Sequence, residues 1–430
     1  MQISQVLDVE EVMDVTRALG IRYRTRMFSP WVTLWTFLWQ VISPDHSCRG
    51  ALMRLHHDQV SSGSQRCNTD TGAYCRARLR LSYDLIVGLY RRVAQRLHSR
   101  LTDESLLWCG RRVKIVDGST VSMPDTPANQ ARFPQQRNQK KGLGFPIARL
   151  VAVLCWGSGA ILDLATCPYQ GKEHSELGML RTLLDHLAPK DVILGDRFYA
   201  NYFMIALLHR RGVDVVMRQH QLRKFDFRRG KRLGRGDHMV AWRKPKCPPW
   251  MARETYDLLP DRLAIREIKA GKLVLVTTLL DPDAFRSESV VALYQSRWHA
   301  ELDLRAIKQT MSMDVLRCLT PDMVLKEIAV HVLAYNLIRA VMFEAAQQHE
   351  LSPRTLSFKA CLQFLLGHRG GLGCRPLDSC TAQPFLIVLI THRVGERPGR
   401  HEPRAVKRRP KPYPLLMEPR DQARARLPRR

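Results

Sequence analysis

The sequence predicts a mixed α/β core that follows a helical N-terminal region and is interrupted by a basic, β-rich insertion. Apolar residues recur with helical spacing over residues 1 to about 105. Short β-branched runs then alternate with helical segments in the order β-β-β-α-β-α-β. Between residues 218 and 272 this regular pattern gives way to strand-like pieces rich in arginine and lysine. With 430 residues, of which 45% are hydrophobic, the chain can form several domains around a sizeable core.

Two N-terminal segments have clear helical spacing. In the first, Trp31, Trp35 and Trp39 recur every four residues, which favours a buried core stripe over a base-stacking role. The second segment, residues 73–97, has three arginines near its start: Arg76, Arg78 and Arg80. These arginines are candidates for phosphate contacts, and the alternative is an ordinary solvated helix face.

Two of the predicted core strands end at an aspartate. Residues 113–116 form a short β-branched run that ends at Asp117, and residues 192–194 lead into Gly195 and Asp196. Between them, two apolar runs are joined by Gly-Ser-Gly, which is typical of a β-hairpin. The other expected elements of this part are strands at 148–155, 160–167 and 213–217 and helices at 173–187 and 201–211.

Helices dominate the part of the chain after the insertion. A strand at 273–280 is followed by a long predicted helix over about 287–311, and then by apolar helices at 323–349 and 356–366. The final residues are basic and rich in proline, which is typical of a disordered tail. The expected domains are a helical DNA-binding domain (1–105), a first core part (106–217), the insertion (218–272), a second core part with C-terminal helices (273–370) and the tail (371–430).

The charge balance indicates a polyanionic partner. Lysine and arginine number 68 and aspartate and glutamate 40, so the formal net charge is +28. A chain this basic usually meets nucleic acid or an acidic membrane surface. The best apolar run, residues 31–42, is far shorter than the ~20 residues of a membrane-spanning helix. We therefore expect nucleic acid and no membrane, and the eleven unpaired-looking cysteines favour the reducing cytoplasm.

One stretch of the predicted helix 287–311 gathers specialised polar residues on a single stripe. Four of them fall within about 60° on a helical wheel: Tyr294, Arg297, Glu301 and Lys308. An apolar stripe adjoins them, so the helix would pack on a core and hold a carboxylate among cations at the rim. The alternative is a solvated face with an ordinary i,i+4 ion pair.

Carboxylates at two strand ends and on this helix can converge in one place. Asp117, Asp196 and Glu301 would then form an oxygen-rich site that suits Mg²⁺ or Mn²⁺. Two such ions would activate a nucleophile and stabilise the leaving oxygen of a phosphoryl displacement. Asp125 in a loop and Asp163 inside the hairpin are weaker candidates, and the acids of residues 172–176 suit an ordinary first helical turn.

At these residues the chain resembles the DDE transposases of bacterial insertion sequences. It is similar to the branch with a Tyr-x-x-Arg-x-x-x-Glu-x-x-x-x-x-x-Lys signature, which is complete here as Tyr294, Arg297, Glu301 and Lys308. The resemblance covers roughly residues 30 to 415. It implies an RNase H-like catalytic core in which Asp117, Asp196 and Glu301 are the three metal-binding acids, with Mg²⁺ as cofactor and Mn²⁺ as a substitute.

The resemblance also implies a reaction and its partners. The enzyme would cut DNA at the transposon ends and join the freed 3′-OH ends to target DNA, in a cut-and-paste reaction through a DNA hairpin. Tyr294, Arg297 and Lys308 would hold a phosphate near the cut, and Trp298 is a candidate for stacking on an extruded base. The partners would be double-stranded end and target DNA and a second copy of the chain, in the bacterial cytoplasm at the nucleoid.

Two other functions remain open from the sequence. A catalytically inactive relative would bind element ends and act as a repressor. A nuclease with an RNase H-like core would hydrolyse DNA without joining strands. Cleavage and strand-joining assays distinguish these from a transposase.

Overall fold

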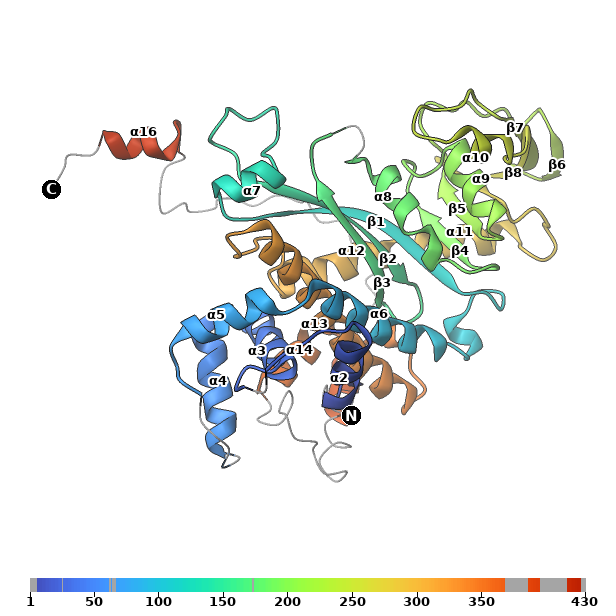
Figure 1. Cartoon of the computed structure of the whole chain (residues 1–430). Coiled ribbons are helices and arrows are strands. Elements are labelled where there is room, and N and C mark those ends of the chain that lie inside the picture. The colour runs from blue at the N-terminus through green and yellow to red at the C-terminus, as the bar shows by residue number, and fades with distance from the viewer. Residues whose placement is uncertain are drawn as a thin grey trace, which may run out of the picture.

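A large mixed sheet forms the centre of the molecule. The computed structural model describes residues 6–24, 26–61, 63, 67–171, 174–367, 386–394 and 416–426. Figure 1 shows the N-terminal helices grouped on one side of the sheet and strands β6 to β8 at its far end. Strands β1 and β4 and helix α12, which lie at or next to the three candidate acids in the sequence, are found between these two regions.

The N-terminal helices are α2 (Val9–Ala18), α3 (Pro30–Ile42), α4 (Cys48–Ser61), α5 (Thr71–Arg80) and α6 (Tyr83–Ser99). Helix α3 begins where the Ser29 hydroxyl accepts the backbone N–H of Val32 at 3.3 Å. Its three tryptophans are buried, with exposed fractions of 7%, 2% and 6% for Trp31, Trp35 and Trp39. The predicted core stripe is therefore confirmed.

The segment 73–97 is helical, as expected, but it forms two helices. Helix α5 ends at Arg80 and α6 begins at Tyr83. Ser82 leaves the helical conformation between them, and its hydroxyl accepts the backbone N–H of Leu85 at 3.4 Å. This cap starts α6 as a separate helix with its own direction.

The nine strands form one sheet in the order β3-β2-β1-β4-β5-β9-β8-β7-β6. Their bounds are β1 (Val113–Ser122), β2 (Ile147–Cys155), β3 (Ile161–Pro168), β4 (Val192–Gly195), β5 (Asp214–Arg218), β6 (Lys231–Gly234), β7 (Asp237–Arg243), β8 (Arg262–Ala270) and β9 (Leu273–Thr277). Strands β1 to β3 form an antiparallel meander, β4 and β5 lie parallel to β1, and β9 pairs antiparallel with β5. This arrangement confirms the predicted fold class, an RNase H-like mixed-sheet core.

The strands of the segment between β5 and β9 extend the same sheet. Strands β6, β7 and β8 pair antiparallel with one another, and β8 pairs with β9. A buried ion pair fixes this extension, because Arg266, which has no exposed surface, donates to Asp237 at 2.5 and 2.9 Å. Two basic residues of the extension, Lys231 and Arg232, lie on β6, the edge strand of the sheet.

The other helices are α7 (Pro127–Arg132), α8 (Glu176–Thr182), α9 (Tyr202–Arg210), α10 (Arg253–Asp257), α11 (Ser287–Gln295), α12 (Trp298–Arg305), α13 (Pro321–Gln347), α14 (Phe358–Gly367) and α16 (Arg420–Ala425). Helix α13 is the longest apolar element, whereas the sequence pointed to residues 31–42. Its length and composition would suit a membrane span, but 94% of its most apolar window is buried inside the protein. It packs against α3, α6 and α14, as the central helix of a core does.

The stretch 287–311, expected as one long helix, is helical in three consecutive pieces. Helix α11 ends at Gln295, α12 begins at Trp298, and residues 306–310 wind as a π-helix. The Ser296 hydroxyl accepts the indole N–H of Trp156 at 2.7 Å and donates to the carbonyl of Leu293 at 2.6 Å. These side-chain bonds compete with the regular backbone bonds and interrupt the helix. Most of the expected tail, 371–385, 395–415 and 427–430, lies outside the described residues.

Candidate active site

Asp117 lies inside β1, not at its end as the sequence indicated. Strand β1 continues to Ser122 by pairing with β2, so that Asp117 faces Ala152. The parallel pairing with β4, however, stops at Ile115 opposite Leu194. Asp117 therefore lies just beyond the point where β1 stops pairing with β4. The strand end that matters for its position is that of the pairing with β4, not the end of β1 itself.

Asp196 follows directly after β4 and sits in a tightly fixed turn. Its Oδ1 accepts the backbone N–H of Phe198 at 2.7 Å, and its carbonyl accepts that of Tyr199 at 3.3 Å. The Tyr199 side chain is fully buried. A Cβ on Gly195 would lie 3.3 Å from the Cβ of Tyr199, so the turn and its tyrosine pack closely. The first two acids thus lie at adjacent positions of one sheet.

Arg297 connects the helix carboxylate to the sheet. Its guanidinium lies 3.2 Å from Oε1 of Glu301 and 3.6 Å from Oδ2 of Asp117. Burial raises the pKa of Asp117 to about 6. Arg297 opposes this rise, and the negative charges of Asp196 and Glu301 add to it. The structure therefore brings all three predicted acids into mutual electrostatic range.

The donor atoms suit a divalent cation in type and in charge. In the described part of the chain, no three His, Cys, Asp or Glu side chains stand close enough to hold a metal ion as they are. The positively charged guanidinium of Arg297 lies between the carboxylates of Asp117 and Glu301 and takes the place of a cation there. Carboxylate oxygens are the ligands that Mg²⁺ and Mn²⁺ prefer. Asp117, Asp196 and Glu301 supply ligand atoms of this type.

The other signature residues surround this site. Lys308, in the π-helical turn, donates to the hydroxyl of Ser119 at 3.0 Å. Ser119 lies two residues after Asp117 and therefore on the same face of β1. Burial raises the pKa of Tyr294, whose neighbours include Arg297 and Asp196.

Trp298 begins α12 beside Arg297 and is 41% exposed. A large aromatic side chain with this much exposed surface is available to a ligand. It is not part of the hydrophobic core.

A fourth carboxylate lies next to the site, and sequence reasoning assigned it to an ordinary helical turn. Glu176, in the first turn of α8, accepts a hydrogen bond from the hydroxyl of Tyr199 at 3.2 Å. A Cβ on Gly118 would lie only 2.5–2.7 Å from its carboxylate atoms. The sequence signal for this contact was a glycine inside a β-branched strand, which marks close approach of another group. Lys172 and Glu173, the start of that acidic segment, lie outside the described residues.

Asp163 and Asp125, the two weaker candidates from the sequence, form hydrogen bonds or ion pairs with other residues of the fold. Asp163 is fully buried and accepts bonds from Tyr90 at 2.8 Å and Arg91 at 2.9 Å, and the ring of His186 lies 2.6 Å away. Asp125 is exposed and accepts a bond from Gln130 at 2.8 Å. Neither residue lies with the three acids.

A second missed carboxylate, Asp303, anchors the signature helix. It is fully buried and is paired with Arg339 of α13 and with Arg354, the latter at 2.6 Å. Arg354 also donates to the carbonyls of Cys155 and Trp156 at 2.8 and 2.7 Å. Asp303 thus ties α12 both to the central helix and to the end of β2. Its position between two leucines gave no sequence signal of this role.

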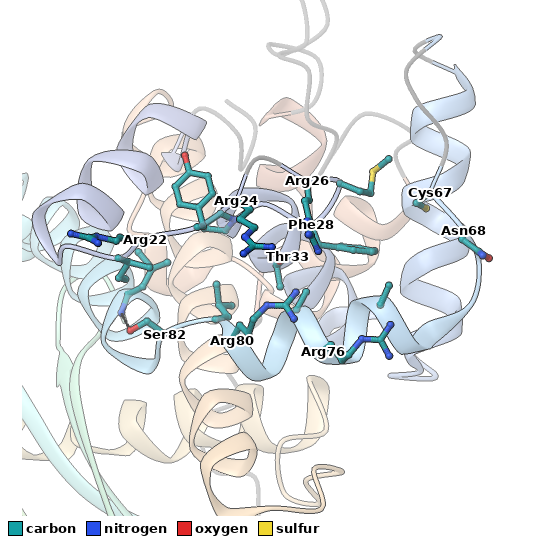
Figure 2. A pocket seen from close by; sticks show the side chains of 18 residues that line it. Arg22, Arg24, Arg26, Phe28, Thr33, Cys67, Asn68, Arg76, Arg80 and Ser82 are labelled. Atoms are coloured by element: carbon teal, nitrogen blue, oxygen red, sulfur yellow. Dashed lines mark hydrogen bonds between the residues drawn. The ribbon is translucent and has the colours of Figure 1, made fainter.

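A separate cationic cavity of about 850 Å³ lies in the N-terminal helical region. Figure 2 shows arginines along both of its sides, from the segment between α2 and α3 and from α5. They are Arg22, Arg24, Arg26, Arg76 and Arg80. Its described lining residues include no acidic side chain.

Arg78 does not join this cavity. Its exposed fraction is 9%, it donates to the side-chain oxygen of Gln40 at 2.9 Å, and its guanidinium lies over the rings of Phe37 and Tyr74. Of the three arginines singled out in the sequence, the structure places Arg76 and Arg80 at the surface and Arg78 in the interior.

The chain is similar to several known proteins. The family described as "Transposase DDE domain" matches residues 108–337. The chain is 28% identical over 361 residues to the transposase InsG for insertion sequence element IS4 of Escherichia coli strain K12, covering 80% of this chain and 77% of that protein. It is 25% identical over 143 residues to the putative transposase InsZ of the same organism, covering 33% of this chain and 46% of that protein. Among solved structures, the piggyBac transposase synaptic complex with hairpin DNA aligns with 93% of this chain and 86% of that chain, at a TM-score of 0.45 and 10% identity.

The family match spans more than half of the chain and includes β1, the turn after β4 and the stretch from α11 to the π-helical turn, which together carry the three acids and the complete signature. The chain therefore belongs to the DDE transposase family.

Proposed function

We propose that this transposase cuts DNA at the ends of its element and joins the freed 3′-OH ends to target DNA, with Asp117, Asp196 and Glu301 as its catalytic acids. The observation that supports this proposal is the meeting of these acids around Arg297, at the edge of β1 that β4 leaves free. A solvated helix face would not carry a half-buried arginine in contact with a strand residue of another element.

The three carboxylates would hold Mg²⁺, with Mn²⁺ as a substitute. When bound, such ions would activate the attacking oxygen and stabilise the leaving oxygen. In the first step water attacks a phosphodiester phosphorus, and the 3′-oxygen leaves as a 3′-OH. In the second step that 3′-OH attacks a phosphodiester of the target and displaces another 3′-oxygen. Each step breaks one P–O bond and forms one.

The basic signature residues would hold the substrate phosphate. Arg297 would exchange its carboxylate contacts for phosphate oxygens, to which its planar guanidinium can donate two bonds. Lys308, on the same face of the site through Ser119, would supply a second positive charge. The hydroxyl of Tyr294 would complete the phosphate contacts.

Trp298 would stack on a base extruded from the duplex at the cut end. Its exposed side chain adjoins Arg297, so a base held there would lie beside the bound phosphate. Such stacking suits a hairpin intermediate, in which the DNA end bends sharply.

The arginine-lined cavity of the N-terminal region would bind the duplex at the element end. Five arginines without an acidic neighbour among the described lining residues are complementary to a phosphate backbone. Arg76 and Arg80 would contact phosphates there, and Arg78 would support the helix from inside. Two chains would act as a homodimer on paired ends, in the cytoplasm at the nucleoid.

Mg²⁺-dependent cleavage of the element's own terminal repeats tests this function. Replacing Asp117 or Asp196 by asparagine, or Glu301 by glutamine, should lower the cleavage rate by more than about 100-fold, because first-sphere ligands matter more than the groups around them. Asp125→Asn, at an exposed aspartate of the same region, is the matched control and should cleave normally. Full cleavage by all three variants would contradict the proposal.

Joining assays with pre-cut ends distinguish the other functions. A transposase gives products in which the element end is linked to target DNA. A nuclease without joining activity would cleave repeats and give no such products. A protein that bound the ends but cleaved in neither Mg²⁺ nor Mn²⁺ would be a repressor.

A further inference from the structure

Glu176 contacts β1 close to the point where β1 and β4 separate. The parallel pairing of these strands stops at Ile115 opposite Leu194, two residues before Asp117 and two before Asp196. The Glu176 carboxylate lies against the backbone of β1 at Gly118, where a Cβ would approach it to 2.5–2.7 Å. A Cβ at residue 118 would require the end of the Glu176 side chain to shift, so the glycine lets this carboxylate lie directly against the strand backbone.

The contact of Glu176 with Tyr199 connects it to the second acid. The Tyr199 hydroxyl donates to Oε2 of Glu176 at 3.2 Å, and the Tyr199 backbone N–H donates to the carbonyl of Asp196 at 3.3 Å. Tyr199 is fully buried, so its ring cannot move without disturbing the core. The carboxylate thus fixes the turn that presents Asp196.

The charges around Tyr199 place Glu176 in the electrostatic environment of the acids. Glu176, Asp117 and Asp196 all act on the Tyr199 hydroxyl and, after burial, raise its pKa. Because Gly118 follows Asp117 in a strand, Glu176 approaches from the face opposite the Asp117 side chain. The two sides of β1 therefore both carry a carboxylate at this position.

We propose that Glu176 is a positioning residue of the active site, which holds the Asp196 turn through Tyr199 and adds a fourth negative charge beside Asp117. This inference rests on the proposed function of the three acids. Its effect is to strengthen the attraction of the site for a divalent cation before DNA arrives.

The alternative for Glu176 is the ordinary stabilisation of a helix by an acid in its first turn. Glu254, in the first turn of α10, has that role without neighbouring catalytic residues and is exposed. Helix stabilisation alone would make both glutamates equally replaceable. Of these two glutamates, Glu176 alone lies against a glycine, Gly118, and accepts a hydrogen bond from a buried tyrosine, Tyr199.

Titration of the full-length, DNA-free chain with Mn²⁺ by isothermal calorimetry tests the proposal. Glu176→Gln keeps the size of the side chain and an oxygen that can accept from Tyr199, but removes the charge. We expect its Mn²⁺ dissociation constant to rise about tenfold or more, as is typical when a group supporting metal ligands is changed. Glu254→Gln should bind Mn²⁺ as the wild type does.

A second variant keeps the test decisive if Glu176→Gln does not fold, as circular dichroism would reveal. Tyr199→Phe leaves the Glu176 charge in place and removes only the bond that holds the turn. We expect it to weaken Mn²⁺ binding and to slow cleavage, each by about tenfold.

Unchanged Mn²⁺ binding in both variants would overturn the inference, and so would an equal loss in Glu254→Gln. That result would leave the proposed function intact as long as Asp117→Asn and Glu301→Gln abolish cleavage. Full cleavage by those two variants would instead contradict the proposed function itself.

Discussion

At the scale of single residues, the site is defined by a carboxylate held in an unfavourable state. Asp117 has an 18% exposed side chain, and burial together with the charges of Asp196 and Glu301 outweighs its one close cation, Arg297. Its pKa is raised to about 6, from an ordinary value of 3.8. A cation bound beside it would relieve this cost, so the same strain that destabilises the free protein favours metal binding.

Asp117→Asn should therefore stabilise the metal-free protein while abolishing cleavage. An aspartate whose pKa rises on folding binds its proton more tightly in the folded state, so its ionisation destabilises the fold as pH rises from about 4 to about 6. At pH 8 the asparagine variant should be more stable by about 1–3 kcal/mol, since one pKa unit corresponds to about 1.4 kcal/mol. Urea unfolding in the presence of a chelator measures this.

The stability difference should nearly vanish at pH 4, where the wild-type carboxyl is protonated in the folded state. A variant that is less stable than the wild type at pH 8 would show that the contact with Arg297 outweighs the burial of Asp117.

At the scale of elements, a buried ion cluster helps to fix the position of helix α12. The cluster is centred on Asp303, two residues after Glu301. Asp303 joins α12 to Arg339 of α13 and to Arg354, which in turn holds the end of β2. Helix α12 lies between the turn at Ser296 and the π-helical turn of residues 306–310. The buried cluster is therefore a tertiary contact that helps to hold Glu301 in place.

Asp303→Asn should lower the free energy of unfolding by about 3–5 kcal/mol, because it leaves two buried or nearly buried arginines without a negative partner. Cleavage should fall with it at temperatures where the protein is still folded. Asp257→Asn is the matched control, since Asp257 forms an exposed i,i+4 pair with Arg253, and should change stability by less than about 1 kcal/mol. Thermal or urea unfolding compares the two, and equal effects would show that the Asp303 cluster does not anchor α12.

At the scale of the whole molecule, positive charge lies on both sides of the acidic site. The arginine-lined cavity is in the N-terminal helical region, and the basic residues of β6 to β8 are at the far end of the sheet. Figure 1 places the strands with Asp117 and Asp196 between these two regions. A duplex that contacted both basic regions would pass the three carboxylates. The net charge of +28 by itself gives no sign of this acidic site.

Replacing Arg76 and Arg80 together by alanine should reduce the salt dependence of end-DNA binding. Each lost phosphate contact lowers the slope of log affinity against log salt by about 0.9, so the pair should lower it by about 2. Arg17→Ala changes an exposed arginine of the same helical region outside the cavity and should leave the slope unchanged. Fluorescence anisotropy over a salt series measures the slopes, and an unchanged slope in the double variant would show that the cavity does not contact phosphate.

The sequence by itself determined the class of fold, the order of the core elements and the chemistry of the signature, because periodicity and residue type are local properties. It indicated the meander of β1 to β3, the core stripe of α3 and the helix with Arg297 and Glu301. Only the tertiary structure decided that the pairing of β1 with β4 stops two residues before Asp117, that Arg78 turns inward, that a turn at Ser296 separates two helices and that Glu176 lies against Gly118. Each of these depends on a partner at least 38 residues away in the chain, as Gln40 is from Arg78. Spacing shows which face a side chain takes, but packing between distant segments decides what it meets there.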